Sequence, residues 1–518
     1  MKQTSEKYGE GETIRLIGRG SKLSLLQLQI VKQKILDAFP GTDVQVITRD
    51  SRGDALTEIP LHTVEGNDFF TRDIFDALAH GEADIAVHSL KDMSSEHFFG
   101  SNKFAVVDRD DTRDVVVLSQ TSKVKREKGE TLIIGTCSPR REEMAIGFLQ
   151  KALPQVKNRP AIETKSIRGN IDTRLRKLDT GDYDGTILAT AGLNRLLNSK
   201  EYGPGVRELL ENKEIILLPL IECVPAPCQG AIVAEGSPLN KKAVEVLDVI
   251  NNAELLNACV LEKKTAQQYG IGCLQRFGVT TIRYGNQEVL YAAGRDSEGT
   301  VFTKWDGLPA LKLEGHKLFS TTDHMGSFFH YEYNDDELTI TEPVVYVANY
   351  KAVQKKELID QLKTKRVLAA GTKTWLELSA NGTWVEGSAD AFGLEFLGKV
   401  LQMPLLNISK SEIAVITNNE AAEIWRSKGW KAYGTYSTVE KYSANTEQQI
   451  READIIFWTS YRQYLQYKVV IKQNATHVCA YGETAQQFKL AGIEPVIFPN
   501  IKAFQQWKQI STRSHSVA

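Results

Sequence analysis

Arginines recur where a predicted strand gives way to a helix, and this pattern carries the clearest chemistry in the sequence. They are Arg19 in GRGS, Arg140 and Arg141 in GTCSPRRE, Arg168 and Arg174 in SIRGNIDTRL, and Arg195 in AGLNRL. In an open α/β sheet the carboxyl ends of the strands face the ligand crevice, and helix N-termini there add partial positive charge. Any one of these arginines could be a solvated surface residue, but six at equivalent positions favour convergence on one cleft. Because arginine binds carboxylates bidentately, the pattern predicts a ligand with many carboxylates.

Two other motifs could take part in chemistry. Lys91 and Asp92, in AVHSLKDM, directly follow a predicted buried strand, so the carboxylate could bind ligand N–H groups or stabilise a developing cation. A helix-capping aspartate beside a surface lysine explains the pair equally well. Cys273 lies in the loop YGIGCLQRFG, whose glycines allow a bulky group to approach the backbone. Its thiol could be a covalent attachment point, or a small buried side chain in a turn.

The elements that must position these residues alternate between strand and helix. Over the first 230 residues, strands are predicted at 13–17, 44–47, 84–87, 114–118, 131–135, 161–166 and 185–190, with helices such as 22–39 between them. This alternation predicts parallel sheets covered on both faces, in two α/β lobes with a ligand cleft between them.

The remainder of the chain divides into a small α+β part and a second α/β region. A helix at 252–268 and strands at 278–282, 289–294 and 301–305 form the small part. Beyond it, strands are predicted at 344–347, 366–370, 412–416, 454–457, 477–480 and 495–498, with a helix at 350–362.

The composition excludes several classes of protein. Among 518 residues, 63 Lys and Arg against 65 Asp and Glu leave a net charge of −2, so no global basic field favours nucleic acid or an anionic membrane. The six cysteines form no CxxC pair and predict free thiols rather than a metal site. The polar N-terminus and the lack of a long apolar run predict a cytoplasmic, soluble chain, which we expect to be monomeric.

Residues 1–312 resemble porphobilinogen deaminase, also called hydroxymethylbilane synthase. The matching motifs are GRGSKLSLLQ, AVHSLKDM, GTCSPRRE, the block IRGNIDTRLRKLDTGDYDGTILATAGLNRL, PAPCQGA and the Cys273 loop, in the family's order. The resemblance implies two periplasmic-binding-protein-like lobes, 1–110 with 213–235 and 111–212, followed by a small α+β domain, 236–312, that carries the cofactor cysteine. The sequence departs from the family pattern at Pro139 and at Cys228, where an apolar residue and a glycine are usual.

The resemblance also implies roles for individual residues. A dipyrromethane cofactor would be joined to Cys273, and four porphobilinogen units would be added to it with release of ammonia, with Asp92 as the catalytic carboxylate. Cofactor binding falls to Lys91, Thr136, Ser138, Arg140, Arg141 and Arg168, and substrate binding to Arg19, Ser21, Gln27, Phe70, Arg174 and Arg195.

Residues 313–518 resemble uroporphyrinogen-III synthase, a two-lobed α/β fold. The similar segments are DIIFWTSYRQY, HVCAYGETAQQFKLAGIEPV and AAGTKTWLEL. The resemblance implies cyclisation of the linear tetrapyrrole to uroporphyrinogen III, with Ser460, Thr484 and Tyr436 in the cleft. Thr484 could equally be a helix N-cap.

Two alternatives to a bifunctional enzyme of tetrapyrrole (haem) biosynthesis stay open. The C-terminal region could be a degenerate structural domain attached to an active deaminase. The whole chain could instead be a non-enzymatic, two-lobed solute-binding protein, although Lys91, Asp92 and the Cys273 loop argue against that function.

Overall fold

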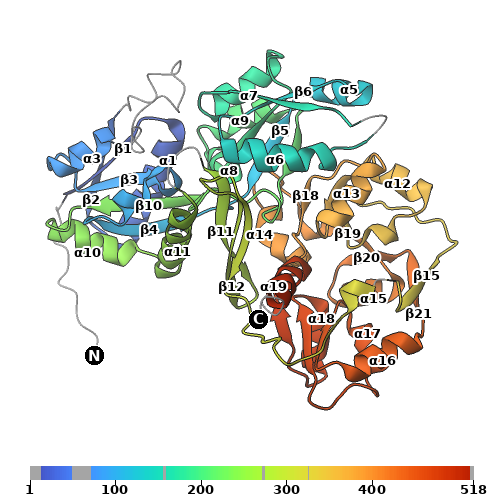
Figure 1. Cartoon of the computed structure of the whole chain (residues 1–518). Coiled ribbons are helices and arrows are strands. Elements are labelled where there is room, and N and C mark those ends of the chain that lie inside the picture. The colour runs from blue at the N-terminus through green and yellow to red at the C-terminus, as the bar shows by residue number, and fades with distance from the viewer. Residues whose placement is uncertain (1–12, 50–71, 156–158, 271–274, 325, 514–518) are drawn as a thin grey trace.

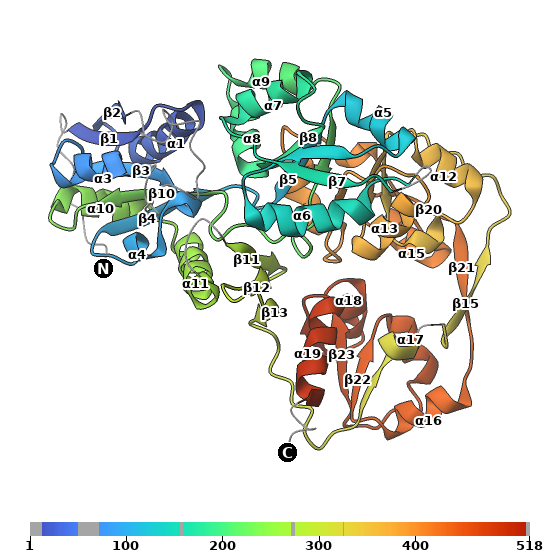
Figure 2. The ribbon, with the colours of Figure 1, turned by 45° about the horizontal axis from the view of Figure 1, so that its top comes forward.

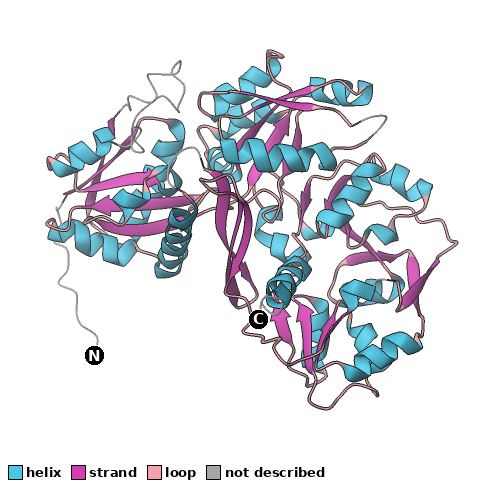
Figure 3. Cartoon of the chain, viewed as in Figure 1, coloured by secondary structure: helices cyan, strands magenta, loops and turns pink. Residues whose placement is uncertain are grey.

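The computed structural model describes residues 13–49, 72–155, 159–270, 275–324 and 326–513. These residues form a first lobe, a second lobe, a small third unit and a C-terminal region (Figure 1). Helices lie against both faces of the sheets in the two lobes (Figure 3), as the strand and helix alternation predicts.

The first lobe is built on a five-stranded sheet of order β2-β1-β3-β10-β4. Strands β1, β2 and β3 are parallel, and β10 pairs antiparallel with β3 and β4. The elements are β1 (Thr13–Arg19), α1 (Lys22–Ala38), β2 (Asp43–Arg49), α3 (Arg72–Ala79), β3 (Ile85–Ser89), the 3-10 turn η2 (Leu90–Asp92), α4 (Ser95–Phe98), β4 (Lys103–Arg109), β10 (Ala231–Gly236) and α10 (Lys241–Ile250). Helix α10 packs its buried side chains into the core of this lobe. The resemblance assigned these residues to the third domain, 236–312.

The second lobe repeats the same arrangement, with a five-stranded sheet of order β7-β6-β8-β5-β9. Here β5 is the strand that runs antiparallel to both neighbours, as β10 does in the first lobe. The elements are β5 (Asp114–Leu118), α5 (Gln120–Lys128), β6 (Leu132–Gly135), α6 (Pro139–Ala152), β7 (Ile162–Lys165), α7 (Ile171–Asp179), β8 (Gly185–Ala189), α8 (Thr190–Asn198), α9 (Gly203–Leu210) and β9 (Glu214–Leu217). The chain therefore crosses between the lobes twice, before β5 and before β10.

The third unit packs one long helix on a three-stranded antiparallel sheet of order β11-β12-β13. Its elements are α11 (Ala253–Tyr269), β11 (Arg276–Tyr284), β12 (Gln287–Arg295) and β13 (Val301–Asp306). Glu262 of α11 is fully buried and accepts two 2.9 Å hydrogen bonds from the Arg109 guanidinium of the first lobe, which ties the unit to that lobe. The same carboxylate accepts the backbone N–H of Cys228.

The C-terminal region contains two parallel sheets, β14-β22-β23-β24 and β18-β17-β16-β19-β20, and an antiparallel ribbon of β15 and β21. Its strands are β14 (Leu318–Ser320), β15 (Phe329–Tyr333), β16 (Val344–Val347), β17 (Arg366–Ala369), β18 (Gly387–Ser388), β19 (Ile413–Thr417), β20 (Lys431–Gly434), β21 (Tyr436–Glu440), β22 (Ile455–Trp458), β23 (Thr476–Ala480) and β24 (Val496–Phe498). Its helices are α12 (Lys356–Leu362), α13 (Thr372–Ala380), α14 (Gly398–Leu401), α15 (Asn419–Ser427), α16 (Ala444–Glu452), α17 (Tyr461–Tyr467), α18 (Glu483–Leu490) and α19 (Ile501–Arg513), with 3-10 turns η3 (Thr321–His324), η4 (Tyr350–Ala352), η5 (Leu394–Leu397) and η6 (Lys410–Glu412).

The helix predicted at 350–362 is wrong over its first half. Residues 350–352 form the isolated turn η4, whose Lys351 N–H donates to the Asn349 side chain, and α12 begins only at Lys356. Asparagine favours such local capping over helix continuation.

The C-terminal region shares hydrophobic cores with the second lobe and the third unit. Trp375 of α13 is fully buried against Phe148 of α6, and the two rings meet edge to face at 5.2 Å. Helices α6 and α13 lie side by side in both ribbon views (Figure 2). Tyr291 of the third unit belongs to the same cluster as Phe457 and Phe498 of the four-stranded sheet.

Among the residues that the structure describes, no helix is both long and apolar enough to cross a membrane.

Candidate active site

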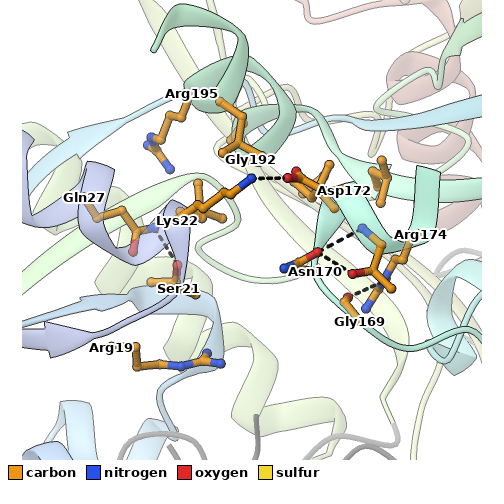
Figure 4. Close-up of a pocket in the computed structure, with 18 of the residues that line it drawn as sticks. Arg19, Ser21, Lys22, Gln27, Gly169, Asn170, Asp172, Arg174, Gly192 and Arg195 are labelled. Carbon is orange, nitrogen blue, oxygen red and sulfur yellow. Dashed lines mark hydrogen bonds and ion pairs between the residues drawn. The ribbon is translucent and has the colours of Figure 1, made fainter. Parts of the chain in front are cut away.

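A cavity of about 910 Å³ lies between the two lobes. Figure 4 shows side chains from both lobes pointing into it. The predicted site residues that line it are Arg19, Ser21, Gln27, Lys91, Arg141, Arg168, Arg174 and Arg195. Its wall also holds Lys22 and Lys177, so eight basic side chains face one acidic side chain, Asp172. The cavity is therefore suited to a strongly anionic ligand.

Strand ends and helix starts explain this convergence. Arg19 is the last residue of β1, and Arg168 lies between β7 and α7. The side chains of Ser21 and Asn170 cap the N-termini of α1 and α7 and lie in the cavity wall. The partial positive charge of these helix ends adds to that of the arginines.

A buried carboxylate holds the paired arginines of α6. Asp114 accepts hydrogen bonds from Arg140 at 2.8 Å and from Arg141 at 2.7 Å. Burial alone would raise the pKa of Asp114, but the two guanidiniums outweigh it and hold that pKa below its ordinary value. Gln229 donates a third hydrogen bond to the carboxylate at 2.9 Å. No sequence motif singles out Asp114, because its position at the start of a strand gives no hint of its partners.

The two arginines of α6 have different surroundings. The Arg140 guanidinium donates to Asp114 and to the Val224 carbonyl at 2.7 Å and does not line the cavity. Arg141 does line it, and its Nε is a buried atom without a hydrogen-bond partner among the described residues. Thr136 and Ser138 also stay outside the wall: their hydroxyls accept backbone N–H groups at the start of α6, where Pro139 takes the first helical position.

Lys91 and Asp92 lie in the turn η2, directly after β3. Burial is the largest cause that lowers the pKa of Lys91, and the charge of Arg141 lowers it further, whereas Asp92 raises it. Asp92 is exposed and does not line the cavity. The cap of the following helix is Ser94, so the capping alternative for Asp92 is wrong.

A buried carboxylate contacts β3, the strand that leads into the turn with Lys91 and Asp92. Glu235 of β10 accepts a 2.6 Å hydrogen bond from His97 and lies 3.2 Å from His88 of β3. Burial would raise the pKa of Glu235, but the neighbouring imidazoles of His88 and His97 outweigh it and lower the pKa to about 2.

Replacing this carboxylate is expected to destabilise the protein at neutral pH. Because the pKa of Glu235 is depressed, its contribution is present above pH ~4.3 and is lost as the pH falls toward the folded-state pKa. We expect Glu235→Gln to lower the free energy of unfolding by about 3 kcal/mol at pH 7, and the gap from the wild type to close between pH 4.5 and 2. Thermal unfolding across this range, with the exposed Glu245→Gln as a control, checks the expectation, which a constant gap would contradict.

Arg195 and Lys22 bridge the two lobes. Arg195 of α8 donates to the Gly230 carbonyl at 2.6 Å, and its Nε has no partner among the described residues. Gly230 has a φ of +83°, and a Cβ there would lie 2.6 Å from the Asp110 carbonyl oxygen, so only glycine fits. Lys22 of α1 pairs with Asp172 of α7 across the cavity. This ion pair was not predicted from the sequence, although both residues lie inside the motifs GRGSKLSLLQ and IRGNIDTRL.

Cys273 and Phe70 lie outside the described residues. At Cys228, the departure from glycine leaves a non-glycine residue at a φ of +61°. Its side chain is fully buried, which raises the pKa of the thiol well above its ordinary value.

The three residues predicted for a second site lie in two places. Ser460 caps α17, and the Thr484 hydroxyl donates to the Thr459 carbonyl at 3.4 Å, so these two residues adjoin the same strand end. The cap of α18 is Gly482, so the capping alternative for Thr484 is wrong. Tyr436 is buried on β21 beside Tyr331, and burial raises its pKa to about 12.

Comparisons with known proteins match the N-terminal half. The family model described as porphobilinogen deaminase, dipyrromethane cofactor binding domain, matches residues 14–245. A porphobilinogen deaminase of Lachnospira eligens is 32% identical over 277 residues, which are 53% of this chain and 86% of that protein. The chain belongs to the porphobilinogen deaminase family. A second deaminase, from Nostoc sp., is 32% identical over 306 residues, 58% of this chain and 87% of that protein.

Family membership settles the function of the N-terminal half. It is a hydroxymethylbilane synthase of tetrapyrrole synthesis that uses dipyrromethane as its cofactor. The alternative of a non-enzymatic solute-binding protein is therefore wrong. Among solved structures, a probable amino-acid ABC transporter extracellular-binding protein, ytmK of Bacillus subtilis, matches 49% of this chain and 97% of its own at 11% identity, with a TM-score of 0.27.

Proposed function

We propose that the deaminase reaction takes place in the arginine cavity, with Asp92, the neighbour in η2 of the cavity-lining Lys91, as the catalytic carboxylate at its edge. The excess of eight basic side chains over one acidic side chain in the wall carries this assignment, because dipyrromethane and the growing pyrrole chain bear acetate and propionate groups. The partnerless Nε atoms of Arg141 and Arg195 further support a fit to an anionic ligand.

Each residue has a proposed role. Cys273 attaches the cofactor, and Lys91, Arg141 and Arg168 bind its carboxylates, while Thr136, Ser138 and Arg140 hold the start of α6. Porphobilinogen and the elongating chain are bound by Arg19, Ser21, Gln27, Phe70, Arg174 and Arg195.

In this proposal the residues of the chain stabilise charge and position the reacting rings. When bound, dipyrromethane supplies the pyrrole end to which porphobilinogen units are joined. The Asp92 carboxylate accepts hydrogen bonds from pyrrole N–H groups and offsets the positive charge that develops as ammonia leaves. The arginines hold the reacting rings in place, which converts a bimolecular step into an effectively unimolecular one.

We further propose that residues 313–518 form a two-lobed module that cyclises the linear tetrapyrrole to uroporphyrinogen III. The pair of parallel sheets joined by the β15–β21 ribbon supports this, and so do the hydroxyls of Ser460 and Thr484 at one strand end. Hydroxymethylbilane closes spontaneously to the type I isomer, so a tethered second site would raise the chance of capture.

Product analysis tests the second activity. The purified chain, given porphobilinogen, is expected to form mainly the type III isomer. Thr484→Val is expected to lower the type III fraction without changing the rate of porphobilinogen consumption, because it removes a hydroxyl far from the arginine cavity. Thr512→Val removes an exposed hydroxyl of α19 and is expected to leave the isomer ratio unchanged. Type I product alone from the wild type would instead identify the C-terminal region as a structural domain.

A further inference from the structure

Two connections join the lobes that form the arginine cavity. The first, residues 110–113, leads into β5, and the second, residues 218–230, leads from β9 to β10. Any change in the spacing of the lobes must be absorbed by the backbone of these connections, as in other hinged two-lobed proteins.

The C-terminal region contacts both connections through the segment that follows β18. Asp390, just after β18, accepts the backbone N–H of Ile221 at 3.5 Å. Its other carboxylate oxygen lies 3.6 Å from Nη2 of Arg113. The Phe396 ring lies against the same guanidinium, 5.2 Å from its centre. A single carboxylate therefore joins the first connection to the second.

Other C-terminal side chains reinforce the second connection. Thr372 donates to the Glu222 carboxylate at 3.1 Å, and Lys502 pairs with the same group at 3.3 Å. Next to this connection, the backbone N–H of Leu217 on β9 donates to the Glu386 carbonyl at 2.7 Å, so the edge strand of the second lobe is covered.

The Asp390 site is built at a cost in stability. Its side chain is fully buried, and its backbone adopts a φ of +51°, a region that aspartate and asparagine tolerate better than most residues. Arg113 is 3% exposed, and its Nε has no hydrogen-bond partner among the described residues. Burial raises the pKa of Asp390 to about 6, which Arg113 partly opposes. Burying Asp390 and Arg113 costs desolvation free energy. If the two side chains served packing alone, apolar residues of similar size would give a fold at least as stable.

We propose that Asp390 is a positioning residue for the deaminase reaction, which fastens the C-terminal region to both interlobe connections and so sets the spacing of the lobes around the arginine cavity. Arg113 precedes Asp114, the carboxylate that holds Arg140 and Arg141, so the fastening acts next to the cofactor arginines. Helix α6, which carries them, is held at its other end too, where Trp375 and Ser379 donate to the Ala152 carbonyl at 3.1 and 2.7 Å.

Asp390→Asn in the full, cofactor-loaded chain tests the proposal. Asparagine keeps the left-handed backbone and an oxygen for the Ile221 N–H. It removes the charge of Asp390, while Arg113 keeps its 2.6 Å ion pair with Asp111. We expect kcat for hydroxymethylbilane release to fall about tenfold with intact dipyrromethane loading by mass, an unfolding midpoint close to that of the wild type, and faster hydrogen exchange at residues 218–224. Asp335→Asn, an exposed aspartate of the same region, is the matched control.

An unchanged kcat with unchanged exchange at residues 218–224 would overturn the proposal. If Asp390→Asn unfolds below the assay temperature, Phe396→Leu is measured in its place. It removes the ring against Arg113, together with the contact of that ring with Phe392, and keeps the Asp390 carboxylate. An unchanged kcat in that folded variant would overturn the proposal as well. The readout is the deaminase rate, so the result does not depend on whether residues 313–518 cyclise the product.

Discussion

Asp92→Asn is expected to reduce the rate of hydroxymethylbilane formation at least about a hundredfold while leaving a folded, cofactor-loaded protein. Asp92 is exposed in the turn η2, so its loss removes no packing. Asparagine keeps the shape of the side chain but cannot offset the positive charge that develops when ammonia leaves. The neighbouring Lys91, whose pKa Asp92 raises, would then lie near that charge without its carboxylate. Initial rates of porphobilinogen consumption measure the loss.

Two controls distinguish a chemical defect from a structural one. Glu96→Gln removes an exposed carboxylate four residues further on, outside the arginine cavity, and should retain the wild-type rate. Cys273→Ser should lack the dipyrromethane mass increment, whereas Asp92→Asn should keep it. A near-normal rate for Asp92→Asn would mean that another group serves as the catalytic carboxylate.

The sequence was sufficient to locate the arginine cavity because strand ends obey a topological rule. Parallel strands present their carboxyl ends at one edge, so the order of strands and helices along the chain is enough to assign Arg19, Arg168 and Arg195 to a common cleft. The same rule does not specify rotamers. Arg140 and Arg141 are adjacent in the chain, yet Arg140 points away from the cavity to Asp114 and a backbone carbonyl.

The packing of the C-terminal region could not be predicted in the same way. Strand and helix periods show that Trp375 lies on an apolar helix face, but not which surface covers it. Its partner, Phe148, is more than two hundred residues away in sequence and lies on a helix whose opposite end carries the cofactor arginines. Contacts between elements so far apart depend on the whole fold, and no local pattern records them.

Asp114→Asn is expected to be more damaging to structure than the loss of Asp92. Asp114 is fully buried, and its carboxylate is the shared counter-charge of Arg140 and Arg141. Removing one partner of a buried ion pair leaves uncompensated charge, which costs about 3–5 kcal/mol, a large part of the stability of a typical domain. We expect a lower unfolding midpoint and a fall in dipyrromethane content, because Arg141 would lose the hydrogen bond that fixes its direction at the cavity wall. Calorimetry and intact mass measure the two effects.

Cofactor content measured in the folded fraction distinguishes a positioning role of Asp114 from a general loss of stability. If the carboxylate positions Arg141, lowering the temperature should restore the folded fraction of Asp114→Asn without restoring full cofactor content. Asp182→Asn, at an exposed turn of the same lobe, should change neither quantity. Full cofactor content and a wild-type rate in the folded fraction would contradict the assignment, because the direction of Arg141 would then be set without its buried partner.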